Sequence, residues 1–174
     1  MKFLAAIGAL AVVAAIGAPV FFFGGFYNVA ATEDLKPVAW MMEQVRFASI
    51  NRHAKDTPSV ALEDGPVVQA GARAFAARGC VNCHGGPGVE WAKFSEGLRP
   101  HPRDLKYAGN ELTPAEMFFV IKNGIYMTGM PALIEVPDPE IWSIAAFVKK
   151  LPSVSEADYK TWTETPASPP AAAK

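Results

Sequence analysis

The sequence predicts an all-α fold in which one N-terminal transmembrane helix precedes a small helical domain. Three observations support this prediction. Residues 3–26 form an uncharged run of 24 residues, 19 of which are apolar. Apolar side chains recur at helical spacing in several later segments, and no convincing alternation typical of a β-strand appears. The 174 residues fit one ordinary domain with appendages.

Composition excludes several classes of protein. A net charge of −1 argues against a nucleic-acid-binding protein, which would carry a basic face. Two cysteines cannot form a disulfide framework. A single apolar run is too little for a transporter with several membrane spans.

Residues 1–30 are interpreted as a membrane anchor. The apolar run of 24 residues spans roughly 36 Å as a helix, which exceeds the ~30 Å of hydrocarbon in a bilayer. Lys2 favours a cytoplasmic start, so we expect a single-pass protein of the bacterial inner membrane with the later residues in the periplasm. The alternative is a cleaved signal peptide, because Val29, Ala30 and Ala31 resemble a cleavage site.

Residues 31–61 are predicted to form a connecting amphipathic helix. Val38, Met41, Met42, Val45 and Ala48 repeat at helical spacing. Three placements remain open for this helix: on the membrane surface, against its own domain, or on a partner subunit.

Residues 62–152 are predicted to form the functional domain, and a helix over 66–78 leads into its main motif. Cys80, Cys83 and His84 form a C-x-x-C-H motif, which is typical of covalent c-type haem attachment. The two thiols can add to the vinyl groups of one porphyrin, and the imidazole can bind its iron. We therefore expect one covalently attached haem c.

Two other interpretations of the motif fit less well. A thioredoxin-like C-x-x-C needs a following helix, but residues 85–88 are Gly-Gly-Pro-Gly. A structural zinc site usually needs a second pair of ligands, and the chain has no further cysteine.

The sixth iron position has four candidate ligands downstream of the motif, namely His101, Met117, Met127 and Met130. Met117 lies within an apolar helical pattern, and His101 lies between two prolines only 17 residues after His84. Met130 lies between a glycine that permits close approach and a proline that stiffens the chain. We expect Met130 to bind the iron and Met127 to be a haem-contact or core residue.

Two further helices are predicted by their ends. Residues 113–116 read Thr-Pro-Ala-Glu, a capping pattern, and Gly124 can end the helix that follows. The last helix begins at Asp138 and ends in two lysines that complement its carboxyl end. Residues 153–174 carry a polar stretch and a proline- and alanine-rich end, and are predicted to be a flexible tail.

From about residue 66 to 152 the chain resembles a class I monohaem cytochrome c of the small bacterial respiratory type. The resemblance rests on the motif at 80–84, on Met130 about 46 residues later, and on Gly71 and Phe75 in the preceding helix. It implies about three main helices around one haem. It also implies that Pro100 or Pro102 offers a carbonyl to the second nitrogen of His84.

Other side chains are candidate haem contacts. Arg99 and Arg103 could pair with haem propionates, or remain solvated surface arginines. Trp91, Phe94 and Tyr107 are expected to line or cover the haem. We therefore expect the haem to be held by Cys80, Cys83, His84, Met130, Pro102 and Arg103, with His84 and Met130 as iron ligands and no catalytic residue.

These observations favour an electron carrier rather than an enzyme. The resemblance implies donor and acceptor proteins such as a quinol–cytochrome c reductase, a terminal oxidase or a periplasmic dehydrogenase. Nine basic and ten acidic residues over 62–152 predict little electrostatic steering. The alternatives are a permanent haem c subunit of a respiratory complex, and a ligand-binding sensor or enzyme with an open iron position.

Overall fold

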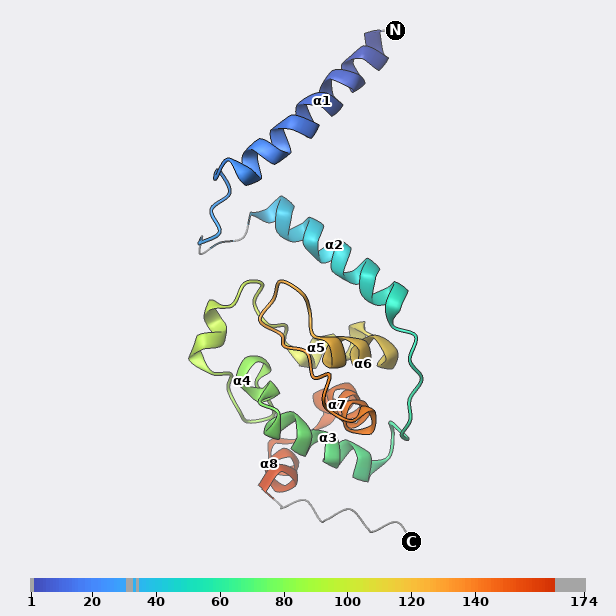
Figure 1. Ribbon diagram of the computed structural model, residues 1–174. Helices are drawn as coiled ribbons and strands as arrows, with labels where there is room; N and C mark the ends of the chain where they lie inside the picture. The colour runs from blue at the N-terminus through green and yellow to red at the C-terminus, as the bar shows by residue number, and fades with distance from the viewer. Residues whose placement is uncertain (1, 31–32, 34, 165–174) are drawn as a thin grey trace. The chain divides into compact units, whose positions relative to one another are not determined.

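A computed structural model describes residues 2–30, 33 and 35–164. Every regular element in this part of the chain is a helix, as predicted (Figure 1). The chain divides into two compact units, Met1–Asp34 and Leu35–Lys174.

The first unit contains α1, Lys2–Phe23, whose most apolar stretch has a mean hydropathy of 2.3. Its 22 residues extend roughly 33 Å, so it is long and apolar enough to cross a membrane. The helix ends at a pair of glycines, where Gly25 has a φ of +80°. A signal sequence would have the same length and apolar character.

The second unit begins with α2 and continues through a bundle of short helices. Its α-helices are α2 (Lys36–His53), α3 (Gly65–Ala77), α4 (Cys80–His84), α5 (Leu105–Glu111), α6 (Pro114–Asn123), α7 (Asp138–Lys150) and α8 (Glu156–Glu164). Two 3₁₀ turns, η1 (Lys93–Gly97) and η2 (Leu151–Ser153), complete the set.

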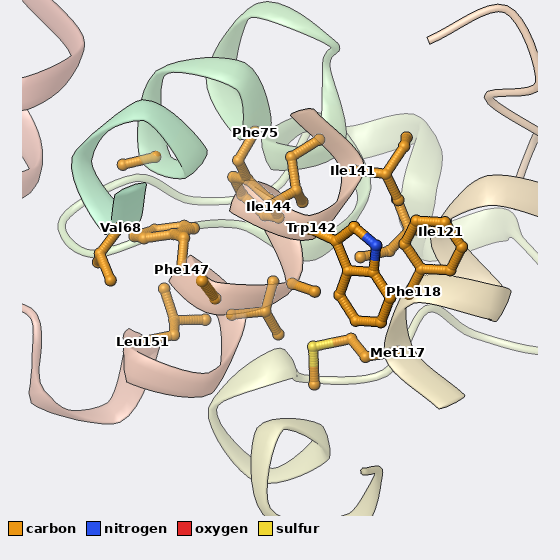
Figure 2. Close-up of a cluster of buried hydrophobic side chains, with 14 of the residues drawn as sticks. Val68, Phe75, Met117, Phe118, Ile121, Ile141, Trp142, Ile144, Phe147 and Leu151 are labelled. Carbon is orange, nitrogen blue, oxygen red and sulfur yellow. The ribbon is translucent and has the colours of Figure 1, made fainter. Parts of the chain in front are cut away.

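The centre of the domain is the crossing of α3 and α7. Gly71 lies directly against the backbone carbonyl of Ser143, where a β-carbon would overlap that oxygen. This close approach brings Phe75 and Phe147 together, with ring centroids 5.3 Å apart (Figure 2). Both rings are almost completely buried, so the crossing helices form the core of the domain.

The two helices predicted from their ends are confirmed. Thr113 and Glu116 form a reciprocal capping box at the start of α6, and Gly124 follows its last residue with a φ of +67°. Phe118 of α6 stacks on Trp142 of α7 with a centroid distance of 4.2 Å (Figure 2). The stack fixes α6 against the centre of α7.

The prediction of a flexible tail from residue 153 onward is wrong for residues 156–164, which form α8. Tyr159 of α8 is only 3% exposed and stacks on Phe147 at 5.6 Å. One buried aromatic side chain therefore fixes a segment whose composition is otherwise polar. The rest of that tail, 165–174, lies outside the described residues.

Three placements were open for the connecting helix, and in the structure this helix, α2, packs against its own domain. Ile50 of α2 is buried together with Val120 of α6. The His53 ring also stacks on Phe119, with centroids 6.3 Å apart. The carboxyl-terminal half of α2 is thus part of the domain, whereas Trp40 and Val45 remain exposed.

Candidate haem-binding site

A cavity of about 430 Å³ lies inside the second unit. Its walls come from α2, α3, α4, α6 and α7, and from the loops around residues 98–103 and 128–133. Apolar side chains dominate the lining. All six residues predicted to hold the haem line this cavity, namely Cys80, Cys83, His84, Pro102, Arg103 and Met130.

Helix α4 delivers the C-x-x-C-H motif to the cavity as a single turn. Gly79 precedes it with a φ of +77°, a left-handed conformation that turns the chain sharply out of α3. Gly85 follows it with a φ of +65°. Because glycines bound the helix on both sides, five residues can place two thiols and an imidazole on one wall.

Both cysteines are free thiols in this structure. Burial raises the pKa of the Cys80 thiol to about 11, so this group is protonated at neutral pH. Both cysteines are partly buried, and both line the cavity.

The second ring nitrogen of His84 is held by the chain. Its Nδ1 lies 2.9 Å from the backbone carbonyl oxygen of Arg103. A carbonyl can only accept, so Nδ1 carries the proton and Nε2 keeps its lone pair. Burial lowers the pKa of His84, which keeps the imidazole in the neutral form that a metal needs.

The expectation that Pro100 or Pro102 supplies this carbonyl is wrong. Both prolines line the cavity, but the hydrogen bond goes to Arg103, the next residue along the chain from Pro102. The physical requirement is one carbonyl at hydrogen-bonding distance, and any residue type can supply it. The sequence identified the correct loop but not the register within it.

The second candidate iron ligand, Met130, lies in a loop that is closed by hydrogen bonds. The Thr128 hydroxyl donates to the carbonyl of Ile125 at 2.7 Å and accepts from the backbone N–H of Met130 at 3.1 Å. A side chain would not fit at Gly124, because its β-carbon would lie only 2.7 Å from the carbonyl oxygen of Met130. These contacts fix the backbone that carries Met130.

The rival ligands occupy different surroundings. Met127 is 71% exposed with a φ of +59° and is not among the lining residues, whereas Met117 lines the cavity from within the apolar core. His101 lines the cavity from the same loop as Pro102, and its Nδ1 lies 2.8 Å from the Pro102 carbonyl. Met130 therefore remains the preferred candidate for the second iron ligand, because it lines the cavity from a loop that hydrogen bonds hold in place.

The two arginines of the loop have protein partners. Arg103 forms an ion pair with Glu111 at 3.0 Å, and Arg99 donates to the carbonyls of Glu96 and Leu98 at 2.9 Å. Of the three aromatic candidates, Phe94 lines the cavity. Trp91 packs edge-on against His101 at 5.9 Å, and Tyr107 is 71% exposed.

Several lining residues were not predicted from the sequence, and among them are Arg46, Phe47 and Ile50 of α2. Their spacing of one and then three residues places them along one side of a helix. That spacing was visible in the sequence, but it could not distinguish a face that packs on the domain from one that faces a membrane.

A comparison with known protein families finds a match for the segment that contains most of the cavity residues. Residues 66–148 match the family model described as cytochrome C oxidase, cbb3-type, subunit III. This segment forms a class I monohaem cytochrome c domain. The searches of curated proteins and of solved structures return no match. The cytochrome c domain implies haem with iron, electron transfer through it, and a respiratory context.

The residues that line the cavity fit a haem. The cavity is apolar, as a porphyrin requires, and its wall carries a neutral imidazole whose Nε2 is available for iron. Two thiols lie on the same short helix as that imidazole. The matched segment runs from the second residue of α3 to near the end of α7, so α2 and α8 lie outside it.

Proposed function

We propose that this protein is a membrane-anchored monohaem c-type cytochrome that transfers electrons between respiratory partners on the periplasmic side. Thioether bonds from Cys80 and Cys83 hold the porphyrin, and His84 and Met130 ligate its iron. The observation that carries the proposal is one apolar cavity lined by Cys80, Cys83, His84 and Met130 together.

The bound haem supplies an iron that alternates between two oxidation states. The chain determines how easily that change occurs. The carbonyl of Arg103 orients the imidazole and keeps its Nε2 unprotonated. The apolar lining excludes water, and a methionine ligand raises the reduction potential.

The anchor determines where the domain works. We propose that α1 remains attached and spans the bacterial inner membrane once, with Lys2 on the cytoplasmic side. A tether raises the effective concentration of the domain near membrane-bound partners. A quinol–cytochrome c reductase, a terminal oxidase and a periplasmic dehydrogenase are the partners that suit such a carrier.

A second candidate is a permanent haem c subunit of a respiratory complex. The description of the matched family, subunit III of an oxidase, favours it. Large apolar side chains such as Tyr126 and Ile134, which are 93% and 65% exposed, also suit a lasting contact. Purification in mild detergent separates the two: a fixed subunit co-purifies in equal amounts with its partners, and a carrier does not.

The ligand assignment is tested by replacing methionines. We expect Met130→Leu to lose the far-red charge-transfer band of methionine-ligated ferric haem, to bind carbon monoxide readily and to have a lower reduction potential. Met127→Leu is the matched control, because Met127 is 71% exposed, and it should keep the native spectrum. A Met130→Leu protein with an unchanged spectrum would contradict the assignment.

A further inference from the structure

The helix α2 precedes the segment that matches the cytochrome c family, yet one of its sides forms part of the cavity. Arg46, Phe47 and Ile50 line the space that the haem would occupy. The matched segment begins at residue 66, well after the end of α2 at His53. The cavity is thus built from more of the chain than the family domain alone.

This side of α2 packs near residues of two loops that line the cavity. The guanidinium of Arg103, whose carbonyl holds His84, lies 5.6 Å from the centre of the Phe47 ring. Ile50 belongs to an apolar cluster against which Met130 packs. One helix therefore contacts Arg103, whose carbonyl holds His84, and shares an apolar cluster with Met130.

Contacts with α6 fix the position of α2. Ile50 is only 6% exposed. Ile50 shares an apolar cluster with Val120 of α6, and His53 stacks on Phe119. These contacts attach the carboxyl-terminal half of α2 to α6, and so they hold the lining residues in place.

The charge of Arg46 has no counterpart among the residues that the structure describes. Within the part of the chain that the structure describes, Arg46 forms no ion pair, whereas Arg103 is paired with Glu111. A half-buried cation at the wall of an apolar cavity requires an anion or water. Haem carries two propionate carboxylates, and a guanidinium matches carboxylate geometry.

We propose that α2 is a wall of the haem site, in which Arg46 pairs with a haem propionate while Phe47 and Ile50 cover the apolar edge of the porphyrin. This inference rests on the proposed function, since it needs a haem in the cavity. It adds a cofactor-binding residue from outside the matched domain.

The test uses the full-length protein purified with its haem in detergent. The variants are Arg46→Gln, Arg46→Lys and the control Arg52→Gln, which removes the same charge from an exposed position on the same helix. Loss of a cation close to the haem favours the ferric form, so Arg46→Gln should lower the reduction potential more than Arg52→Gln does. Arg46→Lys should recover most of that loss.

Infrared difference spectra between the oxidised and reduced forms give a direct readout of the carboxylates. The propionate bands should shift in Arg46→Gln and remain in place in Arg52→Gln. Equal potentials and identical carboxylate bands in these two variants would overturn the role of Arg46. A wild-type chain without covalent haem would instead overturn the proposed function itself.

A second pair of variants tests the apolar cover if Arg46→Gln does not fold. Phe47→Ala should expose the porphyrin edge and speed oxidation of the reduced protein by ferricyanide several-fold. Val45→Ala is the control, because Val45 is 55% exposed and is not among the lining residues. Equal oxidation rates in the two variants would show that α2 does not cover the haem.

Discussion

The Nδ1 atom of His84 lies 2.9 Å from the carbonyl oxygen of Arg103. This hydrogen bond joins the last residue of α4 to a loop 19 positions later in the chain. It fixes both the orientation and the tautomer of the imidazole, and so it prepares a metal ligand before any metal is bound. The acceptor belongs to the backbone, so the bond survives replacement of the Arg103 side chain.

The first prediction follows from that distinction. We expect Arg103→Ala to keep the haem spectrum of the native protein, because the carbonyl remains. Its free energy of unfolding should fall by less than about 1 kcal/mol, since both partners of the ion pair with Glu111 are nearly half exposed. Optical spectra and urea denaturation measure the two quantities.

Glu111→Ala is the matched control for this variant. It removes the other partner of the ion pair, so it should lower stability by a similar amount and leave the spectrum unchanged. A changed spectrum in Arg103→Ala but not in Glu111→Ala would show that the arginine side chain itself contacts the haem.

The second prediction concerns the crossing of α3 and α7. Gly71→Ala should cost at least about 2 kcal/mol of stability, because the added methyl overlaps the Ser143 carbonyl and the helices must separate. Gly65→Ala, in the same helix, meets nothing within 4 Å and should be neutral or slightly stabilising. Denaturant unfolding measures both, and similar stabilities for the two variants would refute the close crossing.

The third prediction concerns a buried hydroxyl. Tyr159 is 3% exposed, and its hydroxyl has no hydrogen-bond partner among residues 2–30, 33 and 35–164. Burial also raises the pKa of this phenol. We expect Tyr159→Phe to raise the free energy of unfolding by about 1 kcal/mol, because an unsatisfied polar group disappears.

Tyr159→Ala provides the contrast for the same site. It removes the ring that stacks on Phe147, and it should cost about 3 kcal/mol. Thermal or urea unfolding of the two variants distinguishes the roles of ring and hydroxyl. A Tyr159→Phe protein less stable than the native one would mean that the hydroxyl has a bonding partner.

The fourth prediction concerns pH. The backbone N–H of Thr113 donates to the Glu116 carboxylate at 2.8 Å, and this hydrogen bond lowers the pKa of Glu116 below its ordinary value of 4.5. A carboxylate with a lowered folded-state pKa contributes stability above that ordinary value, and the contribution disappears as the pH falls through the folded-state pKa.

Glu116→Gln should therefore be less stable than the native protein at pH 7, by on the order of 0.5 kcal/mol. The difference should shrink as the pH falls below about 4. Urea unfolding at several pH values follows it. A stability difference that is constant from neutral to acidic pH would contradict the role of the ionised carboxylate.

Local chemistry made much of the fold predictable. The capping residues Thr113 and Glu116 and the glycine at 124 locate α6 without any tertiary information. The motif at 80–84 likewise indicates its own chemistry, because two thiols and an imidazole at that spacing suit one porphyrin. The capping pattern and the haem-attachment motif could be predicted because the residues that form each of them lie close together in the sequence.

Features that depend on distant contacts could not be predicted in this way. Which carbonyl accepts the hydrogen bond from His84 depends on the exact register of the loop, and a shift of one residue changes the acceptor. Helix α8 forms although its segment is mostly polar, because Tyr159 is buried against Phe147. The contribution of Arg46 and Phe47 to the cavity depends on how α2 packs on α6, which helical spacing alone does not specify.

The most direct test of the account is the optical spectrum of the purified full-length protein after acidic acetone extraction, recorded in alkaline pyridine. We expect one haem per chain to resist extraction and to show the pyridine spectrum of a porphyrin with two thioether bonds. The double variant Cys80→Ala/Cys83→Ala should release any haem that it binds. A native chain that loses all of its haem to the solvent would contradict the account.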